Sequence, residues 1–268
     1  MAVFSFDGFR IAYEQRGRRR GSNARPFVLI HGLLLPRKHH YPLADALAER
    51  GHRVILIDLL GHGESEKPQH SRYYSMSQFA EQVIELLDHL DIDKAVIGGT
   101  SLGANVTLET AVLAPRRVRA MFVEMPVLER AAPAAGVIFL PLTIAYSQGA
   151  SVMEAFAKLM RRAPRGAGVY WDVLIEVLSR DPVASAAVLH GLLTGRIAPH
   201  PSERESMRHP TLIFGHERDI LHPFSDAEAL SRELKNSELL QANSFFELRF
   251  PPNRLSDKLA DFLDEVWG

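Results

Sequence analysis

Residues 95–113 constrain the fold of this chain more than any other stretch. A short apolar run at residues 95–97 leads into Gly99-Thr100-Ser101-Leu102-Gly103, and a helical pattern begins directly after it. A strand that turns into a helix so abruptly leaves no room for side chains beside the turn, and glycines on either side provide that room. The turn exposes the Ser101 hydroxyl at its tip, above the positive end of the helix dipole. The stretch therefore predicts a strand–turn–helix unit that presents a serine.

Apolar runs typical of buried strands alternate with amphipathic stretches typical of helices. Residues 27–30 and 54–57 are continuous apolar runs, as expected of parallel strands that are covered on both faces. Residues 77–90 place their apolar side chains on one helical face. Repeated strand–helix units imply an α/β fold with a parallel sheet and helices on both faces. Further strands are expected at residues 3–6 and 9–14, around the hairpin turn Asp7-Gly8, and at 121–123, 211–214 and 239–240, and further helices at 41–50 and 255–266.

Residues 127–205 interrupt this alternation, because they contain helical patterns and loops but no convincing strand. An insertion between two strands of such a sheet lies over its carboxyl edge, where these folds bind ligands. We therefore expect residues 127–205 to form a helical cap, or lid, over a core of residues 1–126 and 206–268. The alternative is an additional packing layer with no role in binding. Prolines are expected to divide the segment into short helices at Pro133, Pro141, Pro164, Pro182 and Pro199.

Composition narrows the function classes. The 31 Lys and Arg residues nearly balance the 32 Asp and Glu residues, so the overall charge favours neither nucleic acid nor an anionic membrane as a partner. The absence of cysteine excludes disulfides, thiolate metal sites and cysteine nucleophiles. The first residues lack the pattern of a signal peptide, and the most apolar stretch, residues 134–146, is too short to span a bilayer. We expect a cytoplasmic protein with no membrane span, and the sequence leaves a homodimer open.

Three motifs occur in a fixed order along the chain. His31-Gly32-Leu33-Leu34 follows the strand expected at residues 27–30, and residues 58–65 read Asp-Leu-Leu-Gly-His-Gly-Glu-Ser. Residues 99–103 form the Gly-x-Ser-x-Gly elbow. With these motifs at this spacing, the chain resembles the α/β-hydrolase family over nearly its whole length. The resemblance implies a mostly parallel, eight-stranded sheet with helices on both faces and a helical lid.

The resemblance also implies an activity and its residues. The protein would be a serine hydrolase of the carboxylesterase type, acting through an acyl-enzyme on Ser101. The oxyanion would be bound by the backbone N–H groups of Leu33 and Leu102. Leucines at this rim predict a small-to-medium, uncharged, apolar ester or related acyl compound as the substrate. No metal or other cofactor is expected. The further residues expected to bind substrate are His31, Gly32 and Leu34.

The acid of the expected triad matches the family pattern, whereas the base does not. Residues 215–219 resemble the family's Gly-x-x-x-Asp segment, which makes Asp219 the acid. The family's histidine from the last loop is missing, because Phe245 stands at its position and no histidine follows His222. A serine without a base is a poor nucleophile near neutral pH. His222 is the expected replacement because it lies three residues after Asp219, and Glu247 is a second candidate.

Two function classes remain open from the sequence. The elbow with its intact glycines favours a serine hydrolase. The missing histidine favours a hydrolase-fold protein that binds a small apolar ligand with little or no turnover. A third option is a non-ester reaction on the same scaffold, such as carbon–carbon bond hydrolysis. The distance from a histidine ring nitrogen to the Ser101 hydroxyl distinguishes the first two classes, because a general base requires about 2.6–3.2 Å.

Overall fold

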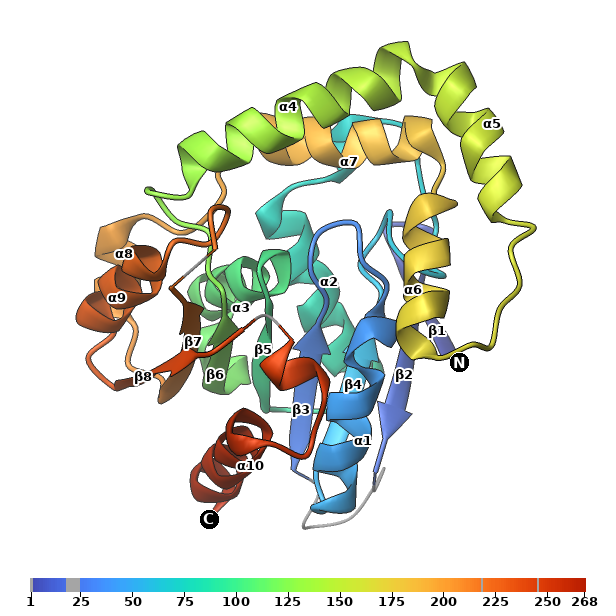
Figure 1. Ribbon diagram of the computed structural model, residues 1–268. Coiled ribbons are helices and arrows are strands. Elements are labelled where there is room, and N and C mark those ends of the chain that lie inside the picture. The colour runs from blue at the N-terminus through green and yellow to red at the C-terminus, as the bar shows by residue number, and fades with distance from the viewer. Residues whose placement is uncertain (1, 18–24, 218, 245) are drawn as a thin grey trace.

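One eight-stranded sheet organises the molecule, with the strand order β1-β2-β4-β3-β5-β6-β7-β8 (Figure 1). The computed structural model describes residues 2–17, 25–217, 219–244 and 246–268. β2 pairs with β1 and β4 in antiparallel fashion, and every later pair is parallel. This confirms the mostly parallel, eight-stranded sheet expected from the sequence. The strands are β1 (Ala2–Phe6), β2 (Phe9–Arg16), β3 (Pro26–Ile30), β4 (Arg53–Ile57), β5 (Ala95–Thr100), β6 (Val118–Glu124), β7 (Thr211–His216) and β8 (Ser237–Ala242).

Helices cover both faces of this sheet. Successive residues of β3 alternate between two apolar clusters, since a strand points its side chains to opposite faces. Val28 and Ile30 belong to the cluster that α2 and α3 cover, whereas Phe27 and Leu29 belong to the cluster that α1 and α10 cover. All four side chains are fully buried, as their continuous apolar run predicts. The helices outside the β6–β7 connection are α1 (Tyr41–Glu49), α2 (Met76–His89), α3 (Leu102–Leu113), α9 (Phe224–Glu233) and α10 (Arg254–Trp267).

The connection between β6 and β7 consists of helices and loops. Figure 1 shows α4 and α7 crossing above the sheet, with α5 and α6 descending at the side. Among helices of the described residues, none is by itself long and apolar enough to cross a membrane. α4 and α5 reach that length and composition only as a pair, which is bent by 91°. The helices are α4 (Ala132–Gln148), α5 (Ala150–Met160), α6 (Val169–Leu178), α7 (Pro182–Thr194) and α8 (Pro201–Ser206).

The expected break at Pro141 is wrong, because α4 continues through this residue. Proline lacks a backbone N–H, so the carbonyl four residues earlier, that of Val137, loses its helical partner. Val137 lies on the solvent side of α4 with 76% of its surface exposed, so water can take the place of that hydrogen bond. Pro133 is likewise compatible with the helix, since it lies in the first turn of α4.

Candidate active site

Ser101 occupies the turn between β5 and α3 in a strained backbone conformation. Its φ of 55° and ψ of −108° lie in a region that residues with a side chain rarely adopt. Such a conformation costs about 1–3 kcal/mol and persists only where the surroundings enforce it. One of these restraints is the Ser101 N–H, which donates to the carbonyl oxygen of Glu124 at 2.8 Å. The side chain is half-buried, so its hydroxyl remains accessible.

The two glycines of the elbow are required by close backbone contacts. A Cβ at Gly99 would lie 2.4 Å from the carbonyl oxygen of Ile30, and a Cβ at Gly103 would lie 2.3 Å from the same atom. Neither distance is compatible with a side chain. The helix and β3 therefore approach each other closely only because both positions are glycine, as the motif predicted.

His222 bridges Ser101 and Asp219. Its Nε2 lies 2.8 Å from Ser101 Oγ, and its Nδ1 lies 2.8 Å from Asp219 Oδ2. Both distances fall within the range expected of a hydrogen-bonded nucleophile, base and acid. The structure thus brings together the three side chains singled out in the sequence as a catalytic set, although His222 comes from the Asp219 loop and not from the last loop of the chain.

Asp219 and His222 are only three residues apart in the sequence, and a tight turn between them allows their side chains to meet. The Oδ1 atom of Asp219 accepts hydrogen bonds from the backbone N–H groups of Leu221 at 2.9 Å and His222 at 3.0 Å. These bonds hold the carboxylate next to the imidazole of His222, which lies in the same loop. Burial alone would raise the pKa of Asp219. The hydrogen bond and charge of His222, together with the two N–H groups, lower this pKa to about 2. Asp219 is therefore ionised at neutral pH.

The other residues considered for the base have different surroundings. Glu247 pairs with Arg254 at 3.0 Å and accepts a hydrogen bond from the N–H of Asn243 at 2.7 Å. Among the described residues, no hydrogen bond joins Glu247 to Ser101. Phe245, the residue aligned with the family histidine, lies outside the described residues. His222 is thus the imidazole that the geometry brings to the serine.

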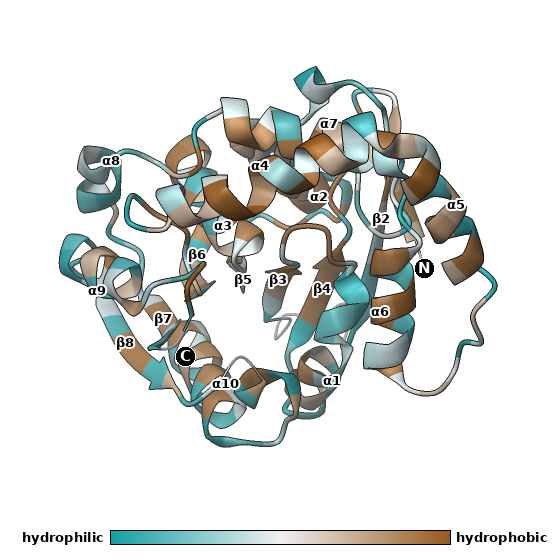
Figure 2. Ribbon diagram, turned by 45° about the horizontal axis from the view of Figure 1, so that its top comes forward, coloured by the Kyte–Doolittle hydropathy of each residue, from teal (hydrophilic) through white to brown (hydrophobic). Residues whose placement is uncertain are grey.

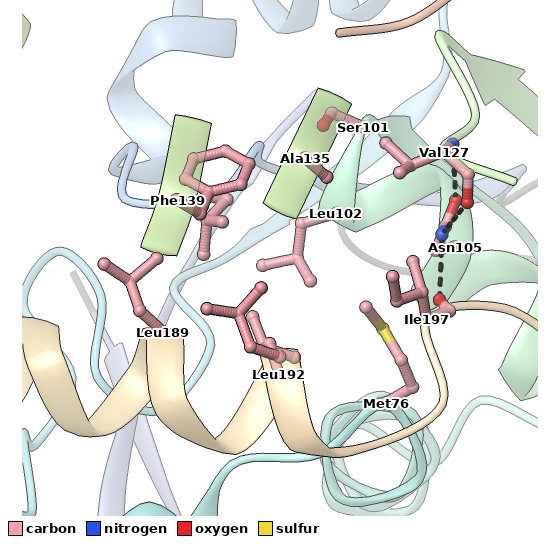
Figure 3. Close-up of a pocket in the computed structure, with 12 residues that line it drawn as sticks. Met76, Ser101, Leu102, Asn105, Val127, Ala135, Phe139, Leu189, Leu192 and Ile197 are labelled. Atoms are coloured by element: carbon pink, nitrogen blue, oxygen red, sulfur yellow. Dashed lines mark hydrogen bonds between the residues drawn. The ribbon is translucent and has the colours of Figure 1, made fainter. Parts of the chain in front are cut away.

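An apolar cavity of about 60 Å³ lies beside Ser101 (Figure 3). Leu33 and Leu102, the two predicted oxyanion residues, both line it. Leu102 begins α3, so its N–H lies in the first turn of the helix, where backbone donors have no intrahelical acceptor. The remaining lining comes mainly from α4 and α7, which form the roof. These other lining residues are Met76, Asn105, Val127, Ala135, Phe139, Leu189, Leu192, Leu193 and Ile197.

His31, Gly32 and Leu34 are not among the residues that line this cavity, so their expected role in substrate binding stays a prediction. His31 is fully buried, and its Nδ1–H donates to the Gly32 carbonyl at 2.9 Å while its Nε2 accepts from the N–H of Leu59 at 3.0 Å. Burial lowers the pKa of His31 to about 4, so the ring is neutral. It joins the loop that follows β3 to the loop that follows β4. The motif signals a loop, and only the fold shows which side of that loop faces the cavity.

Asn105 is a site residue that the sequence did not single out. It lies on α3, four residues after Ser101, and its side-chain amide uses both donors and its acceptor. The Nδ2 atom donates to the carbonyls of Val127 at 2.7 Å and Ile197 at 2.8 Å, and Oδ1 accepts from the N–H of Val127 at 3.1 Å (Figure 3). Val127 lies just after β6, and Ile197 lies between α7 and α8. Asn105 therefore ties two separate segments of the connection between β6 and β7 to the elbow helix.

A buried ion pair between Arg249 and Glu124 lies next to the elbow. Arg249 donates to the carboxylate of Glu124, and both side chains are 1% exposed. Thr100 donates to the same carboxylate, and Arg249 also donates to Thr100 Oγ1 at 3.2 Å. Glu124 in turn accepts the Ser101 N–H through its backbone carbonyl. The last loop of the chain therefore contributes a structural cation at the elbow, which no sequence signal indicated.

His39 and His40, a pair of adjacent histidines, are buried beside β3. His39 bonds to the carbonyl of Pro36 at 2.9 Å, and His40 bonds to the carbonyl of Ile30 at 3.3 Å. Burial lowers the pKa of both rings well below the usual value, so both are neutral. Within the described ranges, no three His, Cys, Asp or Glu side chains are grouped so that they could hold a metal ion.

Known proteins resemble the chain in both sequence and structure. The model of the alpha/beta hydrolase fold family matches residues 25–148. A stretch of 101 residues, 38% of this chain, is 42% identical to the dihydrolipoyllysine-residue acetyltransferase component of the acetoin cleaving system of Pseudomonas putida and covers 26% of that protein. An uncharacterized hydrolase of Bacillus subtilis (strain 168) is 23% identical over 273 residues, which cover 97% of this chain and 96% of the relative.

A solved structure extends the likeness to almost the whole fold. The enol-lactonase from Burkholderia xenovorans LB400 has a TM-score of 0.78 and 20% identity, and the match covers 98% of this chain and 100% of that chain. At this identity the likeness concerns the fold. The family match, the strand order and the elbow agree with one another. The chain has the α/β-hydrolase fold, and its residues 25–148 match the model of that family.

Proposed function

We propose that this protein is a serine hydrolase that cleaves small, uncharged, apolar esters through an acyl-enzyme on Ser101. The observation that carries the proposal is the hydrogen-bonded chain Ser101–His222–Asp219, with both ring nitrogens of His222 at 2.8 Å from their partners. The distance from His222 Nε2 to Ser101 Oγ lies within the reach of a general base. The alternative of a binding protein without turnover predicted a serine with no base in reach.

The proposed reaction follows from these contacts. As Ser101 Oγ bonds to the acyl carbon, its proton passes to His222 Nε2, and the imidazolium is stabilised by the ionised Asp219. The proton then passes to the alcohol oxygen as the ester bond breaks. In the second half, a water molecule attacks the acyl carbon and gives a proton to His222. The bond between the acyl carbon and Ser101 Oγ then breaks, His222 returns the proton to Oγ, and the carboxylic acid leaves. Asp219 remains a carboxylate throughout, because its pKa of about 2 lies far below neutral pH.

Two backbone donors are proposed to stabilise the oxyanion. Leu102 follows the nucleophile at the start of α3, and Leu33 lies on the opposite loop beside the same cavity. Fixed N–H groups stabilise the developing charge without reorganising, and each such donor contributes about 3–4 kcal/mol in measured cases. The strained backbone of Ser101 supports this role, because it orients both the hydroxyl and the following N–H.

The lining of the cavity supports a short apolar acyl group as the substrate part that enters it. Side chains from α4 and α7 lie on either side of Leu102, and Ser101 lines the same cavity (Figure 3). A volume of about 60 Å³ accommodates only a few heavy atoms. A charged group placed there would lack a partner, which costs several kcal/mol. An enol-lactonase and a hydrolase among the similar proteins are consistent with ester cleavage.

Active-site labelling tests the nucleophile. A fluorophosphonate probe should label the wild type and should not label Ser101→Ala. Ser147→Ala removes a serine from the exposed side of α4 and serves as the matched control, which should be labelled like the wild type. Labelling of Ser101→Ala at the wild-type level, or an unlabelled wild type, would contradict the proposal.

A further inference from the structure

Helix α4 is apolar on all sides, although the protein covers only one of them. Its inner face packs onto the fold through Ala135 and Tyr146, which are buried, and through Phe139, which lines the cavity. Its outer face exposes Val137 to 76% and Ile144 to 46%. A helix that is apolar all round is ordinarily surrounded by protein or lipid. The outer face of α4 therefore lacks the cover that its composition requires.

Helix α5 extends this exposed apolar surface. Val152, Phe156 and Leu159 recur at helical spacing on one face, and all three are exposed. No charged residue occurs between Arg130 and Glu154. Figure 2 shows apolar residues along both helices on the outside of the molecule. We name this surface the apolar cap face, which consists of Val137, Ile138, Leu140, Ile144, Val152, Phe156 and Leu159.

A group of basic side chains adjoins the apolar cap face at the end of α5. Lys158, Arg161, Arg162 and Arg165 are all exposed. Glu154, the one acidic residue of α5, already pairs with Arg161 at 2.6 Å and lies 3.8 Å from Lys158. The group therefore carries a local excess of positive charge, even though the whole chain is nearly neutral.

We propose that the apolar cap face binds the surface of an anionic lipid bilayer without crossing it. Helices that lie in a membrane interface combine exposed apolar residues with Lys and Arg residues that face anionic headgroups. The bend of 91° between α4 and α5 fits a surface contact. A second copy of this chain is a poorer occupant, because it would cover the apolar residues without supplying an anionic partner to the adjoining basic group, whereas an anionic bilayer supplies both. The proposal does not depend on catalysis by Ser101.

Co-sedimentation of the full chain with vesicles tests this inference. Wild-type protein should sediment with vesicles that contain phosphatidylglycerol more strongly than with vesicles of phosphatidylcholine alone, and added salt should weaken the binding. Ile144→Glu should lower the partition coefficient about tenfold, since it removes apolar contact and adds a repelled charge. Arg162→Gln and Arg165→Gln should each lower it about fivefold.

A matched control distinguishes vesicle binding through the apolar cap face from nonspecific hydrophobic adsorption. Leu113 at the end of α3 is 44% exposed, close to the 46% of Ile144, but lies outside the cap, so Leu113→Glu should bind vesicles like the wild type. Ser101→Ala should also bind like the wild type. Equal binding of Ile144→Glu and Leu113→Glu, or no preference for phosphatidylglycerol, would overturn the proposal. A wild-type dimer that Ile144→Glu dissociates would instead assign the face to a second copy.

Discussion

At the scale of single residues, the site depends on where one imidazole lies. His222 is separated from Ser101 by 121 positions. Asp219 holds it through two hydrogen bonds, one to its backbone N–H and one to its ring, and accepts a third from the N–H of Leu221 in the same turn. The short spacing works because the carboxylate accepts both backbone N–H groups of the turn and still has an oxygen for the ring. A histidine in the last loop of the chain is thus not required for a hydrogen-bonded set.

Replacing the acid tests this arrangement. Asp219→Asn should lower kcat/KM about 10⁴-fold, because the amide no longer fixes the tautomer or stabilises the imidazolium. The folded-state pKa of about 2 lies below the ordinary value of 3.8, so the carboxylate stabilises the fold above pH 4. This contribution, on the order of 1 kcal/mol after solvent screening, is lost as the pH falls through about 2.

The rate of ester hydrolysis by Asp219→Asn measures the kinetic effect, and urea unfolding as a function of pH measures the effect on stability. Unchanged kinetics of Asp219→Asn would contradict the account.

At the scale of elements, the elbow depends on contacts that exclude a side chain. Gly99→Ala would place a Cβ 2.4 Å from the Ile30 carbonyl and should destabilise the fold by several kcal/mol. Gly136→Ala is the matched control, because a Cβ in this turn of α4 meets nothing within 4 Å and should stabilise the helix by about 1 kcal/mol. Thermal unfolding compares the two variants, and equal Tm shifts would refute this view of the elbow.

The anchoring of the β6–β7 connection by Asn105 gives a second prediction at this scale. Asn105→Ala removes three hydrogen bonds to Val127 and Ile197 and leaves buried backbone groups unsatisfied, which should cost about 1–3 kcal/mol. Proteolysis should become faster between β6 and β7, and KM should rise because the roof of the cavity loosens. Asn236→Ala removes a solvent-exposed amide with one bond to Arg208 and should change neither quantity. Identical proteolysis of both variants would argue against Asn105 as the anchor of this connection.

The sequence predicts local elements better than the contacts between them. The glycine spacing predicts the elbow, and periodicity predicts α2 and α10 to within a residue at each end. Arg249 gave no such signal, because its partner Glu124 lies 125 positions away and only the fold brings the two together. Pro141 was misread for a related reason: the exposed position that lets α4 tolerate it is a property of the tertiary structure.

At the scale of the whole molecule, the mostly parallel sheet with helices on both faces was predictable, because strand–helix units repeat along the chain. The role of residues 127–205 as a lid stays a prediction. The buried histidines add a property of the entire fold. Burial lowers the pKa of His31 to about 4, and His39, His40 and His62 shift in the same direction.

These histidines should make the protein sensitive to acid. Each is neutral in the fold but takes up a proton near pH 6.5 once unfolded, so the stability is fully present above that pH and falls below it, for His31 down to about pH 4. Each histidine should lower the free energy of unfolding by up to about 1.4 kcal/mol per pH unit within this window. Urea unfolding at pH 7.5 and pH 5 measures the effect, and His190→Gln at an exposed position should leave it unchanged. Equal stability at both pH values would contradict the prediction.

The most direct test of the whole account is the rate of ester hydrolysis by His222→Ala beside Glu247→Gln, the variant of the other candidate base. The account predicts that His222→Ala lowers kcat/KM by at least about 10⁴-fold with an unchanged circular dichroism spectrum. Glu247→Gln should remain near the wild-type rate, because Glu247 pairs with Arg254. A His222→Ala protein with wild-type activity, or a Glu247→Gln protein that loses it, would contradict the proposed site.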